Sequence, residues 1–166
     1  MKKVKFIAIL LIIIFVSASN VAAKDMLGLI GIGFNSQLGS RDVSSISVKY
    51  WAGSRLCLQG MLGFQLTDEV DEFDIGGKGL YVIKAEENMN VYAGGGLGIA
   101  NTDPDEEKSD TSFSISGVFG VEYFFSGLPN LGFSTELGLM FSDYDDNDSV
   151  GTGADTFLTA GIHYYF

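Results

Sequence analysis

Three residue types that often stabilise or equip small proteins are nearly absent from this sequence. Its 166 residues include one cysteine, Cys57, one histidine, His163, and two prolines. A single thiol cannot form a disulfide within the chain, and it cannot build a cysteine-ligated metal site. The fold must therefore be held by packing and hydrogen bonding.

Positive charge is also scarce. Ten lysines and arginines stand against 21 aspartates and glutamates, which gives a formal net charge of −11. Phosphate groups are repelled by such a surface. The composition therefore argues against a nucleic-acid partner.

Long apolar runs are limited to one segment near the N-terminus. Residues 6–16 form an unbroken apolar run of 11 residues, which follows three lysines and precedes the small and polar residues SASNVAA. A membrane-spanning helix needs about 20 apolar residues. The order of charged, apolar and small residues predicts a signal peptide over residues 1–23, cleaved after Ala23.

The mature chain is then expected to be residues 24–166, which is 143 residues and enough for one domain. Removal of the three signal lysines leaves seven basic against 21 acidic residues, a net charge of 7 − 21 = −14. Export permits disulfides, but the lone thiol has no partner within the chain. No cofactor is expected.

Beyond the signal peptide, apolar and small or polar residues alternate with a period of two, and no convincing amphipathic helix is found. Leu58 and Leu62, for example, alternate with Gln59 and Met61. Eight such runs are expected to form strands: 27–38, 45–52, 56–66, 74–85, 91–99, 112–124, 131–141 and 155–166. In the first run, Ile30, Ile32 and Phe34 share one face. The run at 74–85 is apolar on both faces, so its register stays open.

The connections between these runs differ in length and chemistry. Three are short, near 53–55, 86–90 and 126–130, and four are longer, at 39–43, 67–73, 101–111 and 142–154. Sixteen of the 21 acidic residues lie in or directly beside the longer connections. One end of the sheet therefore has short connections, and the other end carries longer, anionic loops.

The two faces of the strands indicate where the protein resides. One face is rich in Leu, Ile, Val and Phe, and the other is mostly Gly, Ser, Gln and Thr with few charges. Small, weakly polar residues suit the inside of a narrow closed barrel, and the apolar face then points to lipid. Open sheet edges are too costly in hydrocarbon, so the sheet must close.

The fold class predicted is an all-β, eight-stranded antiparallel up-and-down transmembrane barrel. The alternative is a soluble, lipocalin-like barrel exported to the periplasm.

The C-terminal residues strengthen the membrane interpretation. Leu158, Ala160, Ile162, Tyr164 and Phe166 alternate along the last run, and the chain finishes on an aromatic residue. With the glycine-rich strands YAGGGLGI and GVFGVEYFF, the chain resembles the small OmpA/OmpX-like and opacity-protein-like outer-membrane β-barrel family.

This resemblance implies an outer-membrane location, with extracellular loops and periplasmic termini. It also implies that the barrel-assembly machinery reads Tyr164 and Phe166 as an assembly signal. For function it implies less, because the family includes structural proteins and adhesins.

Four charged residues fall on the inferred lumen face: Lys49, Lys78, Glu122 and Glu136. An isolated buried charge is costly, so these residues are expected to form ion pairs. Glu136, in the middle of its run, is the better candidate. Eight strands leave room for little more than side chains, so a plugged lumen is expected.

Catalytic and metal-binding motifs are weak. His163 stands alone, near the periplasmic end of the lumen face, and a packed or hydrogen-bonded role fits it better than a catalytic base. Asp143, Asp145 and Asn147 match the first three ligand positions of a calcium loop, but Asp148 replaces the required glycine and the bidentate glutamate is missing. No enzymatic activity is predicted, and loose binding of divalent cations at the loops remains an expectation.

The function expected from these features is structural or surface-interacting: envelope integrity, and adhesion through the acidic loops. The alternatives are a small porin-like pore or transport protein and a periplasmic lipocalin-like binder. Expected partners are outer-membrane lipid and lipopolysaccharide and the assembly machinery, and the protein is expected to be a monomer.

Overall fold

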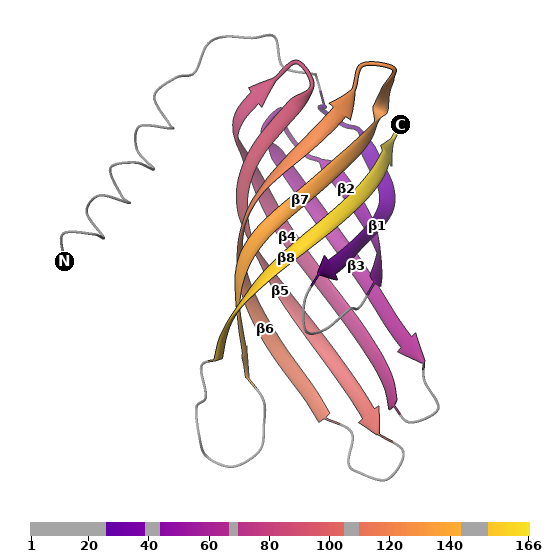
Figure 1. Cartoon of the computed structure of the whole chain (residues 1–166), viewed down its shortest axis with the longest axis vertical. Coiled ribbons are helices and arrows are strands. Elements are labelled where there is room, and N and C mark those ends of the chain that lie inside the picture. The colour runs from indigo at the N-terminus through magenta and orange to yellow at the C-terminus, as the bar shows by residue number, and fades with distance from the viewer. Residues whose placement is uncertain (1–25, 39–43, 67–69, 105–109, 144–152) are drawn as a thin grey trace, which may run out of the picture.

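A computed structural model describes residues 26–38, 44–66, 70–104, 110–143 and 153–166. The signal peptide predicted at residues 1–23 lies outside these ranges. Eight strands form a closed antiparallel barrel in chain order (Figure 1). Their bounds are β1 Ile30–Leu38, β2 Ser44–Trp51, β3 Leu56–Leu66, β4 Val70–Glu86, β5 Met89–Pro104, β6 Asp110–Phe125, β7 Leu128–Asp143 and β8 Gly153–Tyr165. The predicted eight-stranded up-and-down barrel is confirmed.

The barrel closes between its first and last strands. β1 pairs with β8 from Gly31 opposite Tyr165 to Leu38 opposite Leu158. Beyond β8, the N–H of Phe166 donates to the carbonyl of Ile30 at 3.0 Å, and the N–H of Ile30 donates back at 3.1 Å. Because every strand has two neighbours, no strand edge is left open.

One end of the barrel carries the short connections, residues 52–55, 87–88 and 126–127, and also the C-terminus (Figure 1). We call it the turn end, and the opposite end the loop end. The orientation expected from the sequence places the turn end in the periplasm. No helix among the described residues is long and apolar enough to cross a membrane.

Several strands are longer than the sequence predicted. β4 begins at Val70 and not at residue 74, and β5 continues to Pro104 and not to residue 99. The predicted bounds were too narrow because acidic and polar residues near the loops were assigned to the connections. A backbone ladder needs no apolar side chains, so it can continue beyond the apolar band of the wall.

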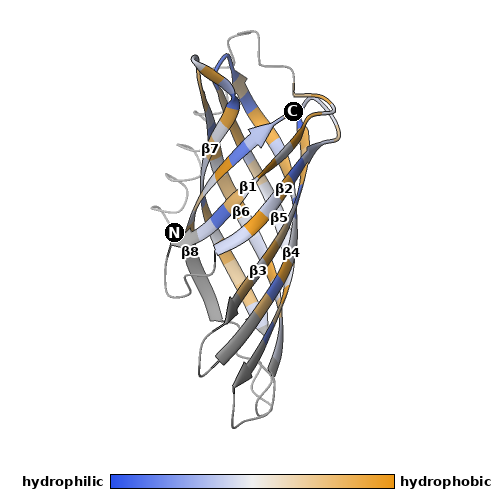
Figure 2. Cartoon of the chain, turned by 90° about the vertical axis from the view of Figure 1, so that its right-hand side faces the viewer, coloured by the Kyte–Doolittle hydropathy of each residue, from blue (hydrophilic) through white to orange (hydrophobic). Residues whose placement is uncertain are grey.

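The alternation predicted for the strands is confirmed by the burial of their side chains. Ile32 and Phe34 of β1 are exposed on the outside, whereas Asn35 is buried. Figure 2 shows hydrophobic and hydrophilic residues intermixed along the strands, as a barrel with opposite inner and outer faces requires. The outer surface is apolar on every strand, from Ile46 on β2 to Leu158 on β8.

The open register of the fourth strand is settled by its partners. Lys78, Leu80 and Val82 are buried inside the barrel, whereas Ile75 and Tyr81 are exposed outside. A register shift between Val82 and Lys84 marks a β-bulge near the turn end. The bulge changes which residues of β4 face inward beyond this point. Both faces of this run are apolar in the sequence because Leu80 and Val82, before the bulge, belong to an apolar cluster inside the barrel.

The outward aromatic residues form two rows. Toward the turn end lie Tyr50, Tyr123, Phe133 and Tyr164, and toward the loop end lie Phe64, Phe113 and Phe141, all of them exposed. Aromatic girdles of this kind flank the apolar band of barrels that cross a membrane.

An apolar cluster fills the lumen at the turn end. Its members are Met26, Trp51, Cys57, Leu80, Val82, Tyr92, Val118, Phe124 and Tyr165. The sequence analysis expected mainly small and weakly polar residues inside, so this cluster is an addition to that expectation. We call it the apolar plug.

Met26 enters the plug from a turn before β1. The N–H of Leu29 donates to the carbonyl of Met26 at 3.0 Å, and Gly28 between them has a φ of 78°. This left-handed conformation favours glycine. The turn directs Met26 inward, where its side chain is 1% exposed.

Candidate functional site

The middle of the lumen is crossed by two ion pairs. Lys49 Nζ of β2 lies 2.9 Å from Glu122 Oε1 of β6, and Lys78 Nζ of β4 lies 2.5 Å from Glu136 Oε2 of β7. All four residues are buried, with relative exposures of 8% or less. The structure therefore brings together the four charged residues assigned to the lumen from the sequence, as two separate pairs.

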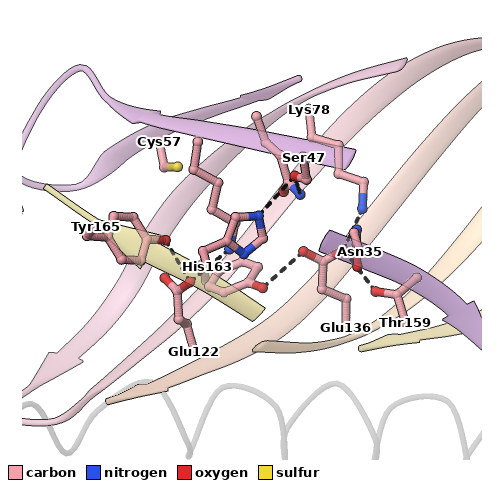
Figure 3. A network of polar contacts seen from close by, with 12 residues as sticks. Asn35, Ser47, Cys57, Lys78, Glu122, Glu136, Thr159, His163 and Tyr165 are labelled. Atoms are coloured by element: carbon pink, nitrogen blue, oxygen red, sulfur yellow. Dashed lines mark hydrogen bonds and ion pairs between the residues drawn. The ribbon is translucent and has the colours of Figure 1, made fainter. Parts of the chain in front are cut away.

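Hydroxyl groups also donate hydrogen bonds to both carboxylates (Figure 3). Tyr165 donates to Glu122 Oε1 at 2.7 Å, and Tyr92 donates to Glu136 Oε1 at 3.0 Å. Thr159 donates to Glu136 Oε2 at 3.3 Å. Hydrogen bonds to an ionised group are stronger than those between neutral groups, so these donors offset part of the cost of burying the carboxylates.

A third cluster centres on Ser47. The amide of Gln59 donates to Ser47 Oγ at 2.8 Å, and His163 Nε2 lies 2.9 Å from the same oxygen. His163 is fully buried in the lumen. It lies on the lumen face, as predicted, and it is packed there with a hydrogen-bond contact to Ser47.

We call these ten residues the lumen belt: Ser47, Lys49, Gln59, Lys78, Tyr92, Glu122, Glu136, Thr159, His163 and Tyr165. They come from every strand except β1. Lys49 Nζ also lies 5.8 Å from the centre of the Tyr92 ring, which brings the two ion-pair clusters into contact. The two positive and two negative groups balance, so the belt carries no net charge.

The local sequence makes space for the two tyrosines of the belt. A side-chain carbon at Gly31 would lie 2.5 Å from the Tyr165 ring, and one at Gly120 would lie 2.7 Å from the Tyr92 ring. Such distances are far below van der Waals contact. These inward glycines are therefore required by the bulky neighbours that the belt uses.

Besides Ser47 and Gln59, sequence reasoning missed Tyr92, Thr159 and Tyr165 as members of the belt. Each occupies an inward position of the alternation, next to the outward residues Val91, Leu158 and Tyr164. A hydroxyl group on an otherwise small inner face was the signal that could have identified them. Their partners could not be identified that way, because those partners lie on distant strands.

The candidate calcium ligands lie at or beyond the edge of the residues that the structure describes. Asp145 and Asn147 lie outside the described residues, and only the backbone of Asp143, the last residue of β7, is described. Within the described ranges, no cluster of three or more His, Cys, Asp or Glu side chains could hold a metal ion.

The two proposed assembly residues lie on the outer face. Tyr164 and Phe166 are 54% and 61% exposed, at the turn end of the closing strand. Their recognition by the assembly machinery stays a prediction.

Solved structures of known proteins share this architecture. The N-terminal β-barrel domain of Pseudomonas aeruginosa OprF matches with a TM-score of 0.67 at 14% identity, over 84% of this chain and 98% of that one. Neisserial surface protein A matches with a TM-score of 0.54 at 16% identity, over 83% and 95%. A de novo designed transmembrane β-barrel matches with a TM-score of 0.50 at 14% identity, over 84% and 97%.

At these identities the likeness is one of fold. No family model matches the chain, and no curated protein matches it in sequence. The chain has the fold of the small eight-stranded outer-membrane barrels. Its closed sheet, apolar outer surface and aromatic rows are those of a barrel embedded in that membrane. The apolar outer surface and the aromatic rows favour this membrane barrel over the soluble lipocalin-like alternative.

Proposed function

We propose that this chain, an eight-stranded barrel of the small outer-membrane type, is a structural protein of the bacterial outer membrane whose lumen is sealed. The wall anchors the protein in the bilayer, and the acidic loops interact with molecules at the cell surface. Neither role requires a catalytic group or a cofactor.

The observation that carries this proposal is the lumen belt. Its side chains link seven of the eight strands across the interior. The two ion pairs and their hydroxyl donors form its rigid part, because each broken contact there leaves a charged group unpaired in a low-dielectric interior. Gln59 Oε1 and His163 Nδ1, by contrast, have no hydrogen-bond partner among the described residues. Below the belt, the apolar plug closes the turn end with Trp51, Phe124 and Met26.

The rival function is a small pore. The two barriers in the lumen argue against it, because a permeating ion would have to pass both the paired charges and the apolar plug. The interior of an eight-stranded barrel is in any case just wide enough for its own side chains.

Electrical recording separates the two functions. Purified, refolded protein is inserted into planar lipid bilayers and the current is measured at a constant voltage. A sealed barrel gives no steps above the lipid background. Regular, reproducible conductance steps would instead support the pore. The positive control for an opened lumen combines Trp51→Ala and Phe124→Ala, which thin the plug, with Lys78→Ala and Glu136→Ala, which open the belt.

The surface-interaction part of the proposal rests on the charge of the longer connections. Sixteen of the 21 acidic residues lie in or beside them. Like charges at such density repel one another, and divalent cations that bridge them to lipopolysaccharide phosphates relieve the repulsion. Cells that lack the protein are expected to be more sensitive to detergent and to chelators, and unchanged sensitivity would contradict a role in envelope integrity.

A further inference from the structure

Glycines gather on the lipid-facing side of one half of the barrel wall. The four neighbouring strands β3 to β6 carry five exposed, outward-facing glycines: Gly60, Gly77, Gly79, Gly95 and Gly117. None occupies a described outward position on β7, β8, β1 or β2. The strand register brings the five together, because Gly60 is opposite Gly77, and Gly95 is opposite both Gly79 and Gly117.

Three of these glycines, Gly77, Gly79 and Gly95, form the floor of a groove. The groove has a volume of about 670 Å³, and the exposed side chains of Leu58, Leu97 and Ile115 stand around it. Across the four strands it extends over three inter-strand spacings, or ~14 Å. Its volume lies within the range of about 300–1,000 Å³ that is usual for sites binding small molecules.

Crowding does not explain three of the five glycines. An added side-chain carbon at Gly60, Gly79 or Gly117 would meet no atom within 4 Å. The inward Gly94 is different, because a carbon there would lie 2.2 Å from the carbonyl oxygen of Gly79. Since glycine weakens a strand, the outward glycines maintain a hollow surface at the expense of strand stability.

The groove is continuous with the surface that faces lipid. On β4, Gly77 and Gly79 lie between the exposed Ile75 toward the loop end and Tyr81 toward the turn end. The material that meets the groove is therefore hydrocarbon. At its exit toward the turn end, Gly79 is followed at the next outward position by Tyr81, which is opposite the small Ala93.

A basic residue lies at that exit. Arg55 is exposed in the turn between β2 and β3, and its carbonyl accepts a hydrogen bond from the N–H of Val82 on β4 at 2.8 Å. This bond holds the turn beside the strand that contributes two of the glycines. Lys84, on the same strand, is already paired with Glu86 at 2.7 Å. The guanidinium of Arg55 is complementary to a phosphate.

We propose that this groove seats one acyl chain of an anionic phospholipid from the leaflet next to the short turns, with its phosphate at Arg55. The inference concerns the outer surface and does not depend on whether the lumen is sealed.

Lipid mobility tests the proposal. The protein is reconstituted into phosphatidylcholine vesicles containing phosphatidylglycerol with a nitroxide on its acyl chain, and electron spin resonance measures the motionally restricted lipid per protein. Filling the groove with Gly79→Leu and Gly95→Leu should lower this component by the equivalent of a single chain. Ala160→Leu, a small outward residue on β8, is the matched control and should leave it unchanged.

Milder and headgroup variants keep the test decisive if the double variant folds poorly. Gly79→Ala, where the added carbon meets no other atom within 4 Å, should reduce the restricted component partially. Arg55→Gln should abolish the preference for labelled phosphatidylglycerol over labelled phosphatidylcholine. Equal amounts of restricted lipid in groove and control variants would overturn the proposal. So would an unchanged headgroup preference, or cross-linking of a wild-type dimer that the filled groove abolishes.

Discussion

Lys78 and Glu136 are separated by 58 residues in sequence, yet Lys78 Nζ lies 2.5 Å from Glu136 Oε2 in the middle of the lumen. The pair links β4 to β7, which are not neighbours in the sheet. It is therefore a contact across the interior and not along the wall. The hydroxyls of Tyr92 and Thr159 donate to the same carboxylate, so the loss of Glu136 affects three partners at once.

Removing Glu136 alone should destabilise the barrel strongly. Glu136→Ala leaves the Lys78 ammonium buried without its counter-ion, for which a loss of about 3–5 kcal/mol in the free energy of unfolding is expected. Reversible urea unfolding in lipid vesicles measures it. Lys78→Met combined with Glu136→Leu should restore much of the loss, because no lone charge then remains. A double variant as unstable as the sum of the two single variants would contradict the pairing.

The contribution of the hydrogen bond from Tyr165 to Glu122 can be tested against a matched control at the neighbouring, outward-facing Tyr164. Tyr165→Phe keeps the ring in the space left by Gly31 and removes the hydroxyl that donates to Glu122 at 2.7 Å. A loss of about 1.5–3 kcal/mol is expected, the range for hydrogen bonds to charged groups. Tyr164→Phe, on the lipid face, should change the unfolding free energy by no more than about 0.5 kcal/mol. Equal effects would show that the bond to Glu122 contributes little.

How much of this could be read from the sequence depends on the kind of contact. The direction of the side chains at Leu58 and Gln59 follows from a period of two, which is a local property of the residue types. The pairing of Lys49 with Glu122 depends on the curvature and stagger of the closed barrel, which no short segment encodes. The sequence could therefore assign four charges to the lumen but could not say which would meet.

The apolar plug was missed for a related reason. Leu80, Val82 and Phe124 lie in stretches where both faces are apolar, so alternation alone does not show which residue points inward. The bulge after Val82 shifts the strand register, and no residue type in this stretch predicts that shift. The ends of β4 and β5 were underestimated because acidic residues are common in loops, although a ladder tolerates them.

Two glycines on one strand should respond oppositely to the same change. At Gly120 an added carbon would lie 2.7 Å from the Tyr92 ring and 2.8 Å from the carbonyl oxygen of Thr135, whereas at Gly117 it meets nothing within 4 Å. Gly120→Ala should therefore destabilise by about 1–3 kcal/mol through overpacking. Gly117→Ala should be neutral or slightly stabilising. The midpoints of urea unfolding of the two variants measure this difference in stability. Equal losses of stability would mean that Tyr92 moves aside without an energetic cost.

Divalent cations should stabilise the loop end. The segments 67–73 and 142–154 are rich in carboxylates, and millimolar calcium or magnesium reduces their mutual repulsion. The melting temperature of the refolded protein is expected to rise with either ion and to fall again when a chelator is added. Asp145→Asn with Asn147→Ser should weaken the response if the candidate ligands take part. Melting curves that ignore both ions and the chelator would remove the cation proposal and leave the fold unaffected.

The closing seam gives the last prediction. Phe166 exchanges two backbone hydrogen bonds with Ile30, and its side chain is 61% exposed on the lipid face. Phe166→Ser retains those backbone bonds and removes an apolar side chain that contributes at most about 1.5–3 kcal/mol. Refolding in detergent should therefore still yield mostly barrel, as measured by heat-dependent mobility on gels. In cells the same variant should reach the outer membrane in reduced amounts, because the assembly machinery is expected to read the terminal aromatic residue before the barrel exists. Phe64→Ser, an exposed aromatic at the loop end, is the control for the loss of a lipid-facing ring. If Phe166→Ser and Phe64→Ser accumulate equally well in the membrane, Phe166 acts only as the end of a strand.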